Sequence, residues 1–312
     1  MAHTIVISEF MDLPAVDLLR AKFDVLYAPD YVKQRAELLA SVGDVPALIV
    51  RNLTQVDKEV LAAAPKLKVV GRLGVGLDNI DVEACEARGI KVIPASGANS
   101  LAVAEYVIGT AMLLLRTAYQ STSATANGKW LKVELGRGRE IAGKTLGLIG
   151  FGAIGRLTAS LAQGVGMRVI AWDPNLPSDL PLWRESRVEK CELAELLGEA
   201  DVVSLHVPLL PTTRNLLNPA NVAKMKAGSI LINTSRGGIV DEAAVVEALK
   251  AGRIGGAAFD VFEKEPLPDS PLFKDVPGLL LTPHIAGVTA ESNQRVSGMI
   301  AREVIAFLEQ HG

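Results

Sequence analysis

Leu146-Gly147-Leu148-Ile149-Gly150-Phe151-Gly152-Ala153-Ile154-Gly155 is the stretch that decides the fold. An apolar run typical of a buried strand leads into the spacing Gly-x-Gly-x-x-Gly and then into an amphipathic segment typical of a helix. In such a motif Gly150 permits a tight turn, Gly152 lets a pyrophosphate approach the backbone, and Gly155 lets helix and strand pack closely. Exposed N–H groups at the helix start, at Ala153 and Ile154, hold the phosphate charge. The spacing alone is a weak signal, and its surroundings decide its meaning.

An acidic residue stands where a dinucleotide site needs one. A second strand is predicted at 168–171, and Asp173 follows it, about 20 residues beyond the glycines. A carboxylate there accepts hydrogen bonds from both ribose hydroxyls and repels a 2′-phosphate. Strand, glycines, helix and acid together predict an NAD site rather than an NADP site. The alternative is a glycine turn with a surface aspartate.

Short apolar runs alternate with amphipathic segments over the whole sequence, which favours parallel sheets covered by helices on both faces. We therefore predict an α/β fold with two Rossmann-like, doubly wound parallel sheets. Residues 99–127 lack a turn signal and predict one long helix, and a last helix is expected at 290–308. The predicted strands lie at 5–7, 25–27, 47–50, 68–70, 91–93, 145–149, 168–171, 202–205, 229–232, 256–259 and 279–281.

Length and composition exclude several classes of protein. At about 150 residues per domain, 312 residues suggest two domains, and 49% hydrophobic residues suffice for two cores. A net charge of −3 offers no basic excess for nucleic acid or anionic lipid. Cys85 and Cys191 lie far apart, so we expect neither a disulfide scaffold nor a metal site, and a reducing cytoplasm fits. We expect no secretion signal, and the apolar stretch 101–115 is too short to span a membrane.

Reduction of a carbonyl needs a proton carrier, and only four histidines are available. His3 and His311 lie near the chain ends, and His206 follows a predicted strand without an acidic neighbour in sequence. His284 follows the last predicted strand and opens a loop that contains a glycine. Loops at the carboxyl ends of parallel strands form the ligand crevice, so His284 is the candidate. The alternative is a hydrogen-bonded loop histidine without a catalytic role.

Two further candidates follow neighbouring predicted strands. Arg236 stands before two glycines, and a guanidinium fork can bind a carboxylate and a carbonyl oxygen together. A structural salt bridge is its alternative role. Glu263 and Glu265 follow the next strand, and a carboxylate beside an imidazole stabilises the protonated ring and fixes its tautomer. The chemistry leaves the choice between these two glutamates open, and a solvated acidic loop is possible for both.

Several motifs together resemble those of the D-isomer-specific 2-hydroxyacid dehydrogenases, in particular the 3-phosphoglycerate dehydrogenase branch. The resemblance extends over essentially the whole sequence, and residues 103–109 are also similar to bacterial sulfolactate dehydrogenases. The motifs are Gly71–Asn79, the glycine motif, His206-Val207-Pro208-Leu209, Thr234-Ser235-Arg236-Gly237, Asp260-Val261-Phe262 with Glu265-Pro266, and Pro283-His284.

The resemblance implies NAD-dependent interconversion of a small 2-hydroxy acid and its 2-oxo acid. Arg236 would bind the substrate carboxylate and carbonyl, His284 would be the acid and base, and Glu265 would pair with His284. Arg51 and Arg72 could each meet a second anionic group or be structural. Gly74, Val75 and Gly76 would contact the substrate, the latter two through N–H groups. Beyond the glycine motif and Asp173, the implied NAD contacts are His206, Pro208, Thr213, Thr234, Ser235, Arg236, Asp260, His284, Ala286 and Gly287.

The resemblance also implies a discontinuous, flavodoxin-like substrate domain, formed by residues 1–98 and 288–312. An NAD-binding domain at 99–287 would be inserted into it and carry a dimerisation arm near 99–140, which makes a homodimer the expected assembly. We expect no C-terminal regulatory domain, and Glu265, in place of a glutamine, argues against formate as substrate. The alternative function is an NAD(H)-sensing scaffold of the corepressor type without dehydrogenase activity.

Overall fold

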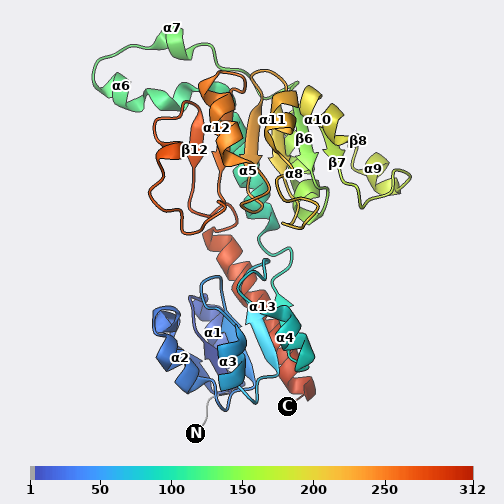
Figure 1. Ribbon diagram of the computed structural model, residues 1–312. Helices are drawn as coiled ribbons and strands as arrows, with labels where there is room; N and C mark the ends of the chain where they lie inside the picture. The colour runs from blue at the N-terminus through green and yellow to red at the C-terminus, as the bar shows by residue number, and fades with distance from the viewer. Residues whose placement is uncertain (1–3, 312) are drawn as a thin grey trace. The chain divides into compact units, whose positions relative to one another are not determined.

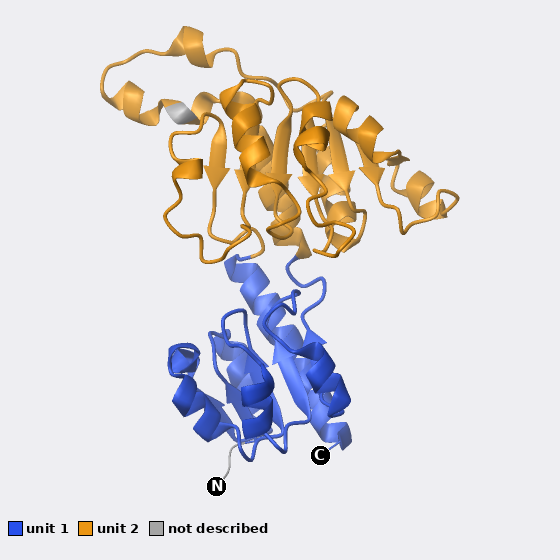
Figure 2. Ribbon diagram, in the orientation of Figure 1, with its two compact units in different colours: residues 1–99, 288–312 blue, residues 100–287 orange. Residues whose placement is uncertain are grey.

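Two separate parallel sheets form the structure, a computed structural model that describes residues 4–311, apart from the side chain of Gln120. His3 therefore lies outside the described residues. Two compact units result: unit 1 contains residues up to 99 and from 288, and unit 2 contains residues 100–287 (Figures 1 and 2). Among residues 4–311, none of the helices combines the length and the apolar content needed to cross a bilayer.

Unit 1 is built on a five-stranded sheet in the order β2-β1-β3-β4-β5, the order of flavodoxin-like folds. Alternate side chains of its strands enter two cores. Ile5, Ile7 and Ile49 pack against α1 and α13 on one face, and Val6 and Leu48 pack against α2, α3 and α4 on the other. The elements are β1 Ile5–Ile7, α1 Leu13–Arg20, β2 Val25–Tyr27, η1 Pro29–Lys33, α2 Arg35–Ser41, β3 Ala47–Val50, α3 Lys58–Ala63, β4 Val69–Arg72, α4 Val82–Ala87, β5 Lys91–Pro94 and α13 Ala290–His311.

Unit 2 is built on a seven-stranded sheet in the order β12-β11-β10-β9-β6-β7-β8. Helices α5 and α8 cover one face, and α10, α11 and α12 cover the other. The strand order reverses between β6 and β9, and in open α/β sheets ligands bind outside the carboxyl ends of the strands at such a point. The elements are α5 Ser100–Arg116, η2 Ala118–Ser121, α6 Thr122–Ala126, α7 Lys132–Leu135, β6 Thr145–Ile149, α8 Ala153–Gly164, β7 Arg168–Trp172, α9 Pro181–Glu185, β8 Glu189–Lys190, α10 Leu193–Glu199, β9 Val202–Leu205, α11 Pro219–Lys224, β10 Ile230–Asn233, α12 Glu242–Lys250, β11 Gly256–Phe259, η3 Pro271–Phe273 and β12 Leu279–Leu281.

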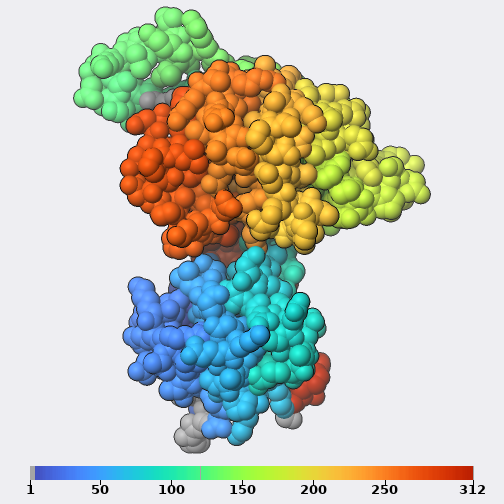
Figure 3. Space-filling model, in the orientation of Figure 1, coloured from blue at the N-terminus to red at the C-terminus, as the bar shows by residue number. Residues whose placement is uncertain are grey.

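The prediction of one long helix over residues 99–127 is wrong. Helix α5 ends at Arg116, and Thr117 has a left-handed backbone with φ 55°. The following residues are mostly Ser, Thr and Ala, and without a packed apolar face Ser and Thr favour caps and turns over a helix. Short helices α6 and α7 lie in a segment that leaves the body of unit 2, shown in green in Figure 3. Within it Tyr119, Trp130 and Val133 are 68%, 79% and 75% exposed.

Candidate functional site

The glycine loop between β6 and α8 has the shape of a phosphate-binding turn. Gly150 has φ +98°, and a Cβ there would lie 2.6 Å from the His206 carbonyl oxygen. A Cβ on Gly155 would lie 2.5 Å from the Gly150 carbonyl oxygen, so both positions require glycine for folding. A Cβ on Gly152 would have no neighbour within 4 Å, which leaves its backbone open to a ligand. The buried Thr234 Oγ1 makes no hydrogen bond among the described residues, and a bound polar group could satisfy it. Both features fit NAD.

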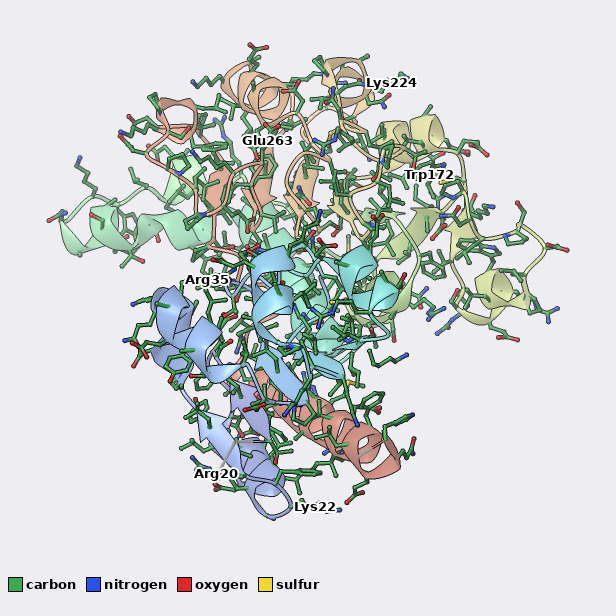
Figure 4. All side chains as sticks on the ribbon, turned by 60° about the horizontal axis from the view of Figure 1, so that its bottom comes forward. Arg20, Lys22, Arg35, Trp172, Lys224 and Glu263 are labelled. Carbon is green, nitrogen blue, oxygen red and sulfur yellow. The ribbon has the colours of Figure 1, made fainter. Side chains whose placement is uncertain are left out.

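Asp173 is tied to the same loop. Its Oδ2 accepts the N–H of Phe151 at 2.9 Å, and its Oδ1 accepts the N–H of Asn175 at 3.0 Å. A carboxylate has about four acceptor positions, so ribose hydroxyls can still bind. The Phe151 ring is buried and stacks on Trp183 with ring centroids 4.9 Å apart, which anchors the loop from inside the unit. Trp172 precedes the acid at the end of β7 (Figure 4).

The different surroundings of two glycines predict different defects. Gly152→Ala is expected to fold with an unchanged thermal midpoint, because its methyl group meets no protein atom within 4 Å. It should bind NADH at least about tenfold more weakly, because in this motif the pyrophosphate approaches the backbone at the second glycine. Gly150→Ala should instead lower the thermal midpoint, because it meets backbone at a positive φ. Calorimetry and NADH fluorescence titration measure both. Equal NADH affinity of Gly152→Ala and the wild type would contradict the placement of the pyrophosphate.

His206 lies at the switch point itself, directly after β9. Its N–H donates to the Ile149 carbonyl oxygen at 2.7 Å, and its Nε2 lies 3.0 Å from Ser204 Oγ. Burial lowers the pKa of His206 to about 4, so the ring is neutral at pH 7. The backbone N–H of His206 thus joins the end of β9 to β6, and its neutral ring adds no charge at this point of the sheet.

This pKa of His206 predicts acid sensitivity of the fold. Between pH 6.5 and about 4 the unfolded chain binds a proton at this ring that the folded chain does not bind, so the free energy of unfolding falls as the pH falls. The residue accounts for a loss of at most about 3 kcal/mol over that interval. Urea unfolding of wild type and His206→Asn at pH 7, 5.5 and 4.5 measures it, and the variant should lose less. If the free energy of unfolding falls equally with pH in the two proteins, His206 is not the source of the acid sensitivity.

A buried amide positions Arg236. Asn233, the last residue of β10, donates from Nδ2 to the Arg236 carbonyl oxygen at 3.0 Å and accepts the N–H of Ser235 at 3.0 Å. Ser235 Oγ donates to the Leu205 carbonyl oxygen at 2.6 Å, which joins the loop to β9. Arg236 Nη1 donates to the Ser235 carbonyl oxygen at 2.7 Å. Sequence reasoning missed Asn233, although an amide at a strand end before a turn is a usable signal.

The structure pairs His284 with Glu265. His284 Nδ1 lies 2.6 Å from Glu265 Oε2, and Glu265 Oε1 accepts the N–H of Phe262 at 2.9 Å. Glu263 (Figure 4) does not make this pair; its N–H donates to Glu242 Oε1 at 3.0 Å. His284 adopts a left-handed backbone with φ 56°, a conformation uncommon outside glycine and typical of residues held in place by their surroundings.

Asp260 holds the loop that carries His284. It is 1% exposed, its Oδ1 accepts from Thr282 Oγ1 at 2.6 Å and from the N–H of Ile285 at 2.8 Å, and its Oδ2 accepts the N–H of Ala286 at 2.8 Å. Tyr106 Oη lies 2.7 Å from Thr282 Oγ1, and burial raises the pKa of Tyr106, so the tyrosine is neutral. These contacts hold the loop from Thr282 to Ala286 in place.

All of these groups follow strands of unit 2 at one edge of its sheet. Gly150 follows β6, Asp173 follows β7, Arg236 follows β10, and His284 follows β12. The loop after β9 is closed by Thr213, whose Oγ1 donates to the Pro208 carbonyl oxygen at 2.6 Å. Parallel strands therefore bring the predicted cofactor and catalytic residues of this unit to a common edge, as expected for an open α/β sheet.

The remaining predicted substrate residues belong to unit 1. Gly74, Val75 and Gly76 follow β4, and the Arg72 guanidinium packs so closely on Gly74 that a Cβ there would collide with it. Gly74 N–H also donates to the Arg72 carbonyl oxygen at 2.8 Å. Arg72 thus supports the 74–76 turn.

Arg51 lies at the switch point of the sheet of unit 1, after β3 and next to β1. The buried Glu9 carboxylate accepts the N–H groups of residues 51–54 at 2.8, 3.3, 3.2 and 2.9 Å, which fixes the turn. Arg51 Nη2 donates to Asn293 Oδ1 at 2.7 Å, and the guanidinium lies 5.8 Å from the Phe10 ring centroid. Sequence reasoning missed Glu9 and Asn293, because both act through contacts with residues distant in sequence.

Comparison with known proteins gives consistent matches. Residues 108–286 match the family described as D-isomer specific 2-hydroxyacid dehydrogenase, NAD binding domain. The chain is 52% identical to the (S)-sulfolactate dehydrogenase of Chromohalobacter salexigens over 94% of each chain. It is 39% identical to the hydroxypyruvate reductase of Thermotoga maritima over 97% of each chain. The crystal structure of the TT0316 protein from Thermus thermophilus is similar, with a TM-score of 0.87 and 35% identity over 98% of this chain and 97% of that one.

Proposed function

Since the chain belongs to the D-isomer-specific 2-hydroxyacid dehydrogenases, we propose that it interconverts a 2-hydroxy acid with a second anionic group on C3 and the matching 2-oxo acid. The protein is an NAD-dependent oxidoreductase. The observation that carries the substrate class is the 52% identity to a sulfolactate dehydrogenase, so sulfolactate and sulfopyruvate are the first candidates. 3-Phosphoglycerate is the next candidate, and glycerate, which carries only a neutral hydroxyl group on C3, is the alternative outside this class. The relatives named above are a dehydrogenase and a reductase, and nothing among them favours the corepressor alternative.

The stereochemical label of the relative agrees with the family. In lactate the carboxyl group outranks the methyl group, and the D isomer is R. In sulfolactate the sulfur atom makes the sulfomethyl group outrank the carboxyl group, so the same arrangement in space is named S. An enzyme that forms (S)-sulfolactate therefore adds the hydride to the same face of the carbonyl group as an enzyme that forms D-lactate. The same arrangement of binding groups suits both substrates.

For the reaction we assign roles to the residues of unit 2. The carboxylate and carbonyl oxygen of the 2-oxo acid bind the Arg236 guanidinium, which polarises the carbonyl bond. Bound NADH supplies the hydride that adds to the carbonyl carbon. His284 donates its Nε2 proton to the carbonyl oxygen, while Glu265 at Nδ1 stabilises the imidazolium and fixes the ring. In total, the 2-oxo acid, NADH and one proton are converted into the 2-hydroxy acid and NAD. Oxidation of the 2-hydroxy acid reverses each step.

In unit 1 we assign the backbone N–H groups of Val75 and Gly76, with the Gly74 turn, to the substrate carboxylate. We assign Arg51 to the second anionic group. Its support is its place at the switch point of this sheet and a guanidinium already oriented by Asn293 and Phe10. An arginine held in this way loses little side-chain entropy when it binds a sulfonate or phosphate.

A panel of 2-oxo acids tests the substrate class. NADH oxidation at 340 nm is followed with sulfopyruvate, phosphohydroxypyruvate, hydroxypyruvate, glyoxylate and pyruvate. We expect the highest kcat/KM with sulfopyruvate, and in Arg51→Gln a loss of at least about tenfold with sulfopyruvate but not with pyruvate. Equal rates with pyruvate and sulfopyruvate would contradict the proposed class. If no acid of the panel causes NADH oxidation although NADH binds tightly, the result would instead favour the sensing scaffold.

We also propose a cytoplasmic homodimer that associates through residues 117–140. The exposed Trp130 and Val133 of this segment support the association, since such large apolar side chains are more often found at interfaces. The free cysteines Cys85 and Cys191 suit a reducing compartment. Light scattering of wild type and Trp130→Glu tests the assembly, and a dimer that the substitution leaves intact would contradict the interface.

A further inference from the structure

We propose that Glu242 is a positioning residue, which holds the loop that carries Glu265 so that Glu265 and His284 keep their contact. The inference rests on the roles proposed above for Glu265 and His284. Glu242 is the first residue of α12, and the reaction scheme above does not use it.

A continuous set of hydrogen bonds runs from helix α12 to the imidazole. Glu242 is the first residue of α12 and is half-buried, and its Oε1 accepts the N–H of Glu263 at 3.0 Å. The neighbouring N–H, that of Phe262, donates to Glu265 Oε1 at 2.9 Å, and Glu265 Oε2 lies 2.6 Å from His284 Nδ1. One carboxylate on a helix therefore fixes the backbone from which the turn toward Glu265 begins.

The same peptide also supports the loop of Arg236. A Cβ on Gly237 would collide with the carbonyl group of Phe262 and with the nitrogen of Glu263, so Gly237 packs directly against the peptide that joins these two residues. A shift of this peptide would disturb the Arg236 loop and Glu265 together. Glu242, on helix α12, holds the peptide between Phe262 and Glu263 in place by accepting its N–H.

The alternative role for Glu242 is a favourable charge at a helix N-terminus. Asp241 already caps this helix, since its side chain accepts the N–H of Ala244 at 2.9 Å. Burial and the nearby Glu263, Asp241 and Glu265 raise the pKa of Glu242, so the carboxylate stands in unfavourable surroundings for a negative charge. A residue needed only for the helix would be better placed in solvent, whereas one needed as an acceptor must lie against the peptide.

Three variants separate the two roles. Glu242→Met keeps the length of the side chain and removes the acceptor; Glu242→Gln keeps an acceptor oxygen and removes the charge. Glu247→Ala, an exposed position on the same helix, is the matched control. We expect Glu242→Met to lower kcat at least about tenfold with an unchanged Kd for NADH, because small misplacements of catalytic groups are costly. Glu242→Gln should retain kcat within about threefold and Glu247→Ala should match the wild type.

Amide hydrogen exchange of Glu263 provides a second readout, which does not depend on turnover. It should become faster in Glu242→Met and stay slow in Glu242→Gln, and the same measurement on Glu242→Ala replaces it if the methionine variant does not fold. Unchanged kcat in Glu242→Met, or equal losses in the Met and Gln variants, would overturn the proposal. His284→Ala in the same assay distinguishes failure of this proposal from failure of the proposed function. If His284→Ala retains turnover, His284 is not the proton carrier, whatever the result for the Glu242 variants.

Discussion

His284→Ala is expected to lower turnover at least about a hundredfold while NADH still binds. The imidazole is the group that exchanges a proton with the substrate oxygen, and its Nδ1 is already engaged by Glu265 at 2.6 Å, which leaves Nε2 for that exchange. The glycine loop and Asp173 do not depend on this ring for their hydrogen bonds. Binding of NADH should therefore survive when turnover fails. Stopped-flow reduction of sulfopyruvate and fluorescence titration with NADH measure the two quantities.

His311→Ala is the matched control, because its ring stacks on Phe307 and its Nδ1 lies 2.9 Å from the Phe307 carbonyl oxygen in the last turn of α13. It should have the turnover of the wild type. Near-normal turnover of His284→Ala would remove His284 from the mechanism. A Glu265→Gln variant should have an intermediate loss, since glutamine can still accept a hydrogen bond from Nδ1 but cannot balance the charge of an imidazolium.

The sheets are predictable from sequence because buried parallel strands are short apolar runs between polar helices. Strands β1, β3, β6 and β9 have the bounds that the apolar runs indicate. Strand β8 was missed, since its residues Glu189 and Lys190 have no apolar pattern and are recognisable only by their pairing with β7. The end of α5 was also missed, because no glycine or proline follows Arg116 to mark the boundary.

The site is predictable where chemistry follows a strand. His284 and Arg236 could be found because loops after parallel strands form the crevice. The choice between Glu263 and Glu265 could not be made from residue chemistry, because it depends on how the backbone turns after Phe262. Asn233 and Glu242 act on backbone groups of other segments, so their partners become visible only in the folded chain.

Arg236→Lys is expected to lower kcat/KM at least about a hundredfold for every 2-oxo acid, about 2.7 kcal/mol of transition-state stabilisation. A lysine ammonium can meet the carboxylate or the carbonyl oxygen, but it lacks the planar fork that holds both in a fixed geometry. The fold should be little affected, because Asn233 binds the backbone carbonyl of residue 236 and not its side chain. Steady-state kinetics over the panel of acids, with a thermal melt of the same preparation, measures the effect.

Arg35→Lys is the control variant, because it makes the same replacement of a guanidinium by an ammonium group away from the proposed site. Arg35 (Figure 4) bridges Asp57 at 2.6 Å and Glu59 at 2.9 Å on the exposed surface of unit 1, where such pairs contribute little. Its kcat/KM should equal that of the wild type. Unchanged kinetics of Arg236→Lys across the panel would contradict its role at the carbonyl. A loss confined to acids with a second anionic group would move Arg236 from the common carboxylate and carbonyl to the C3 substituent, because only the common groups are shared by every acid tested.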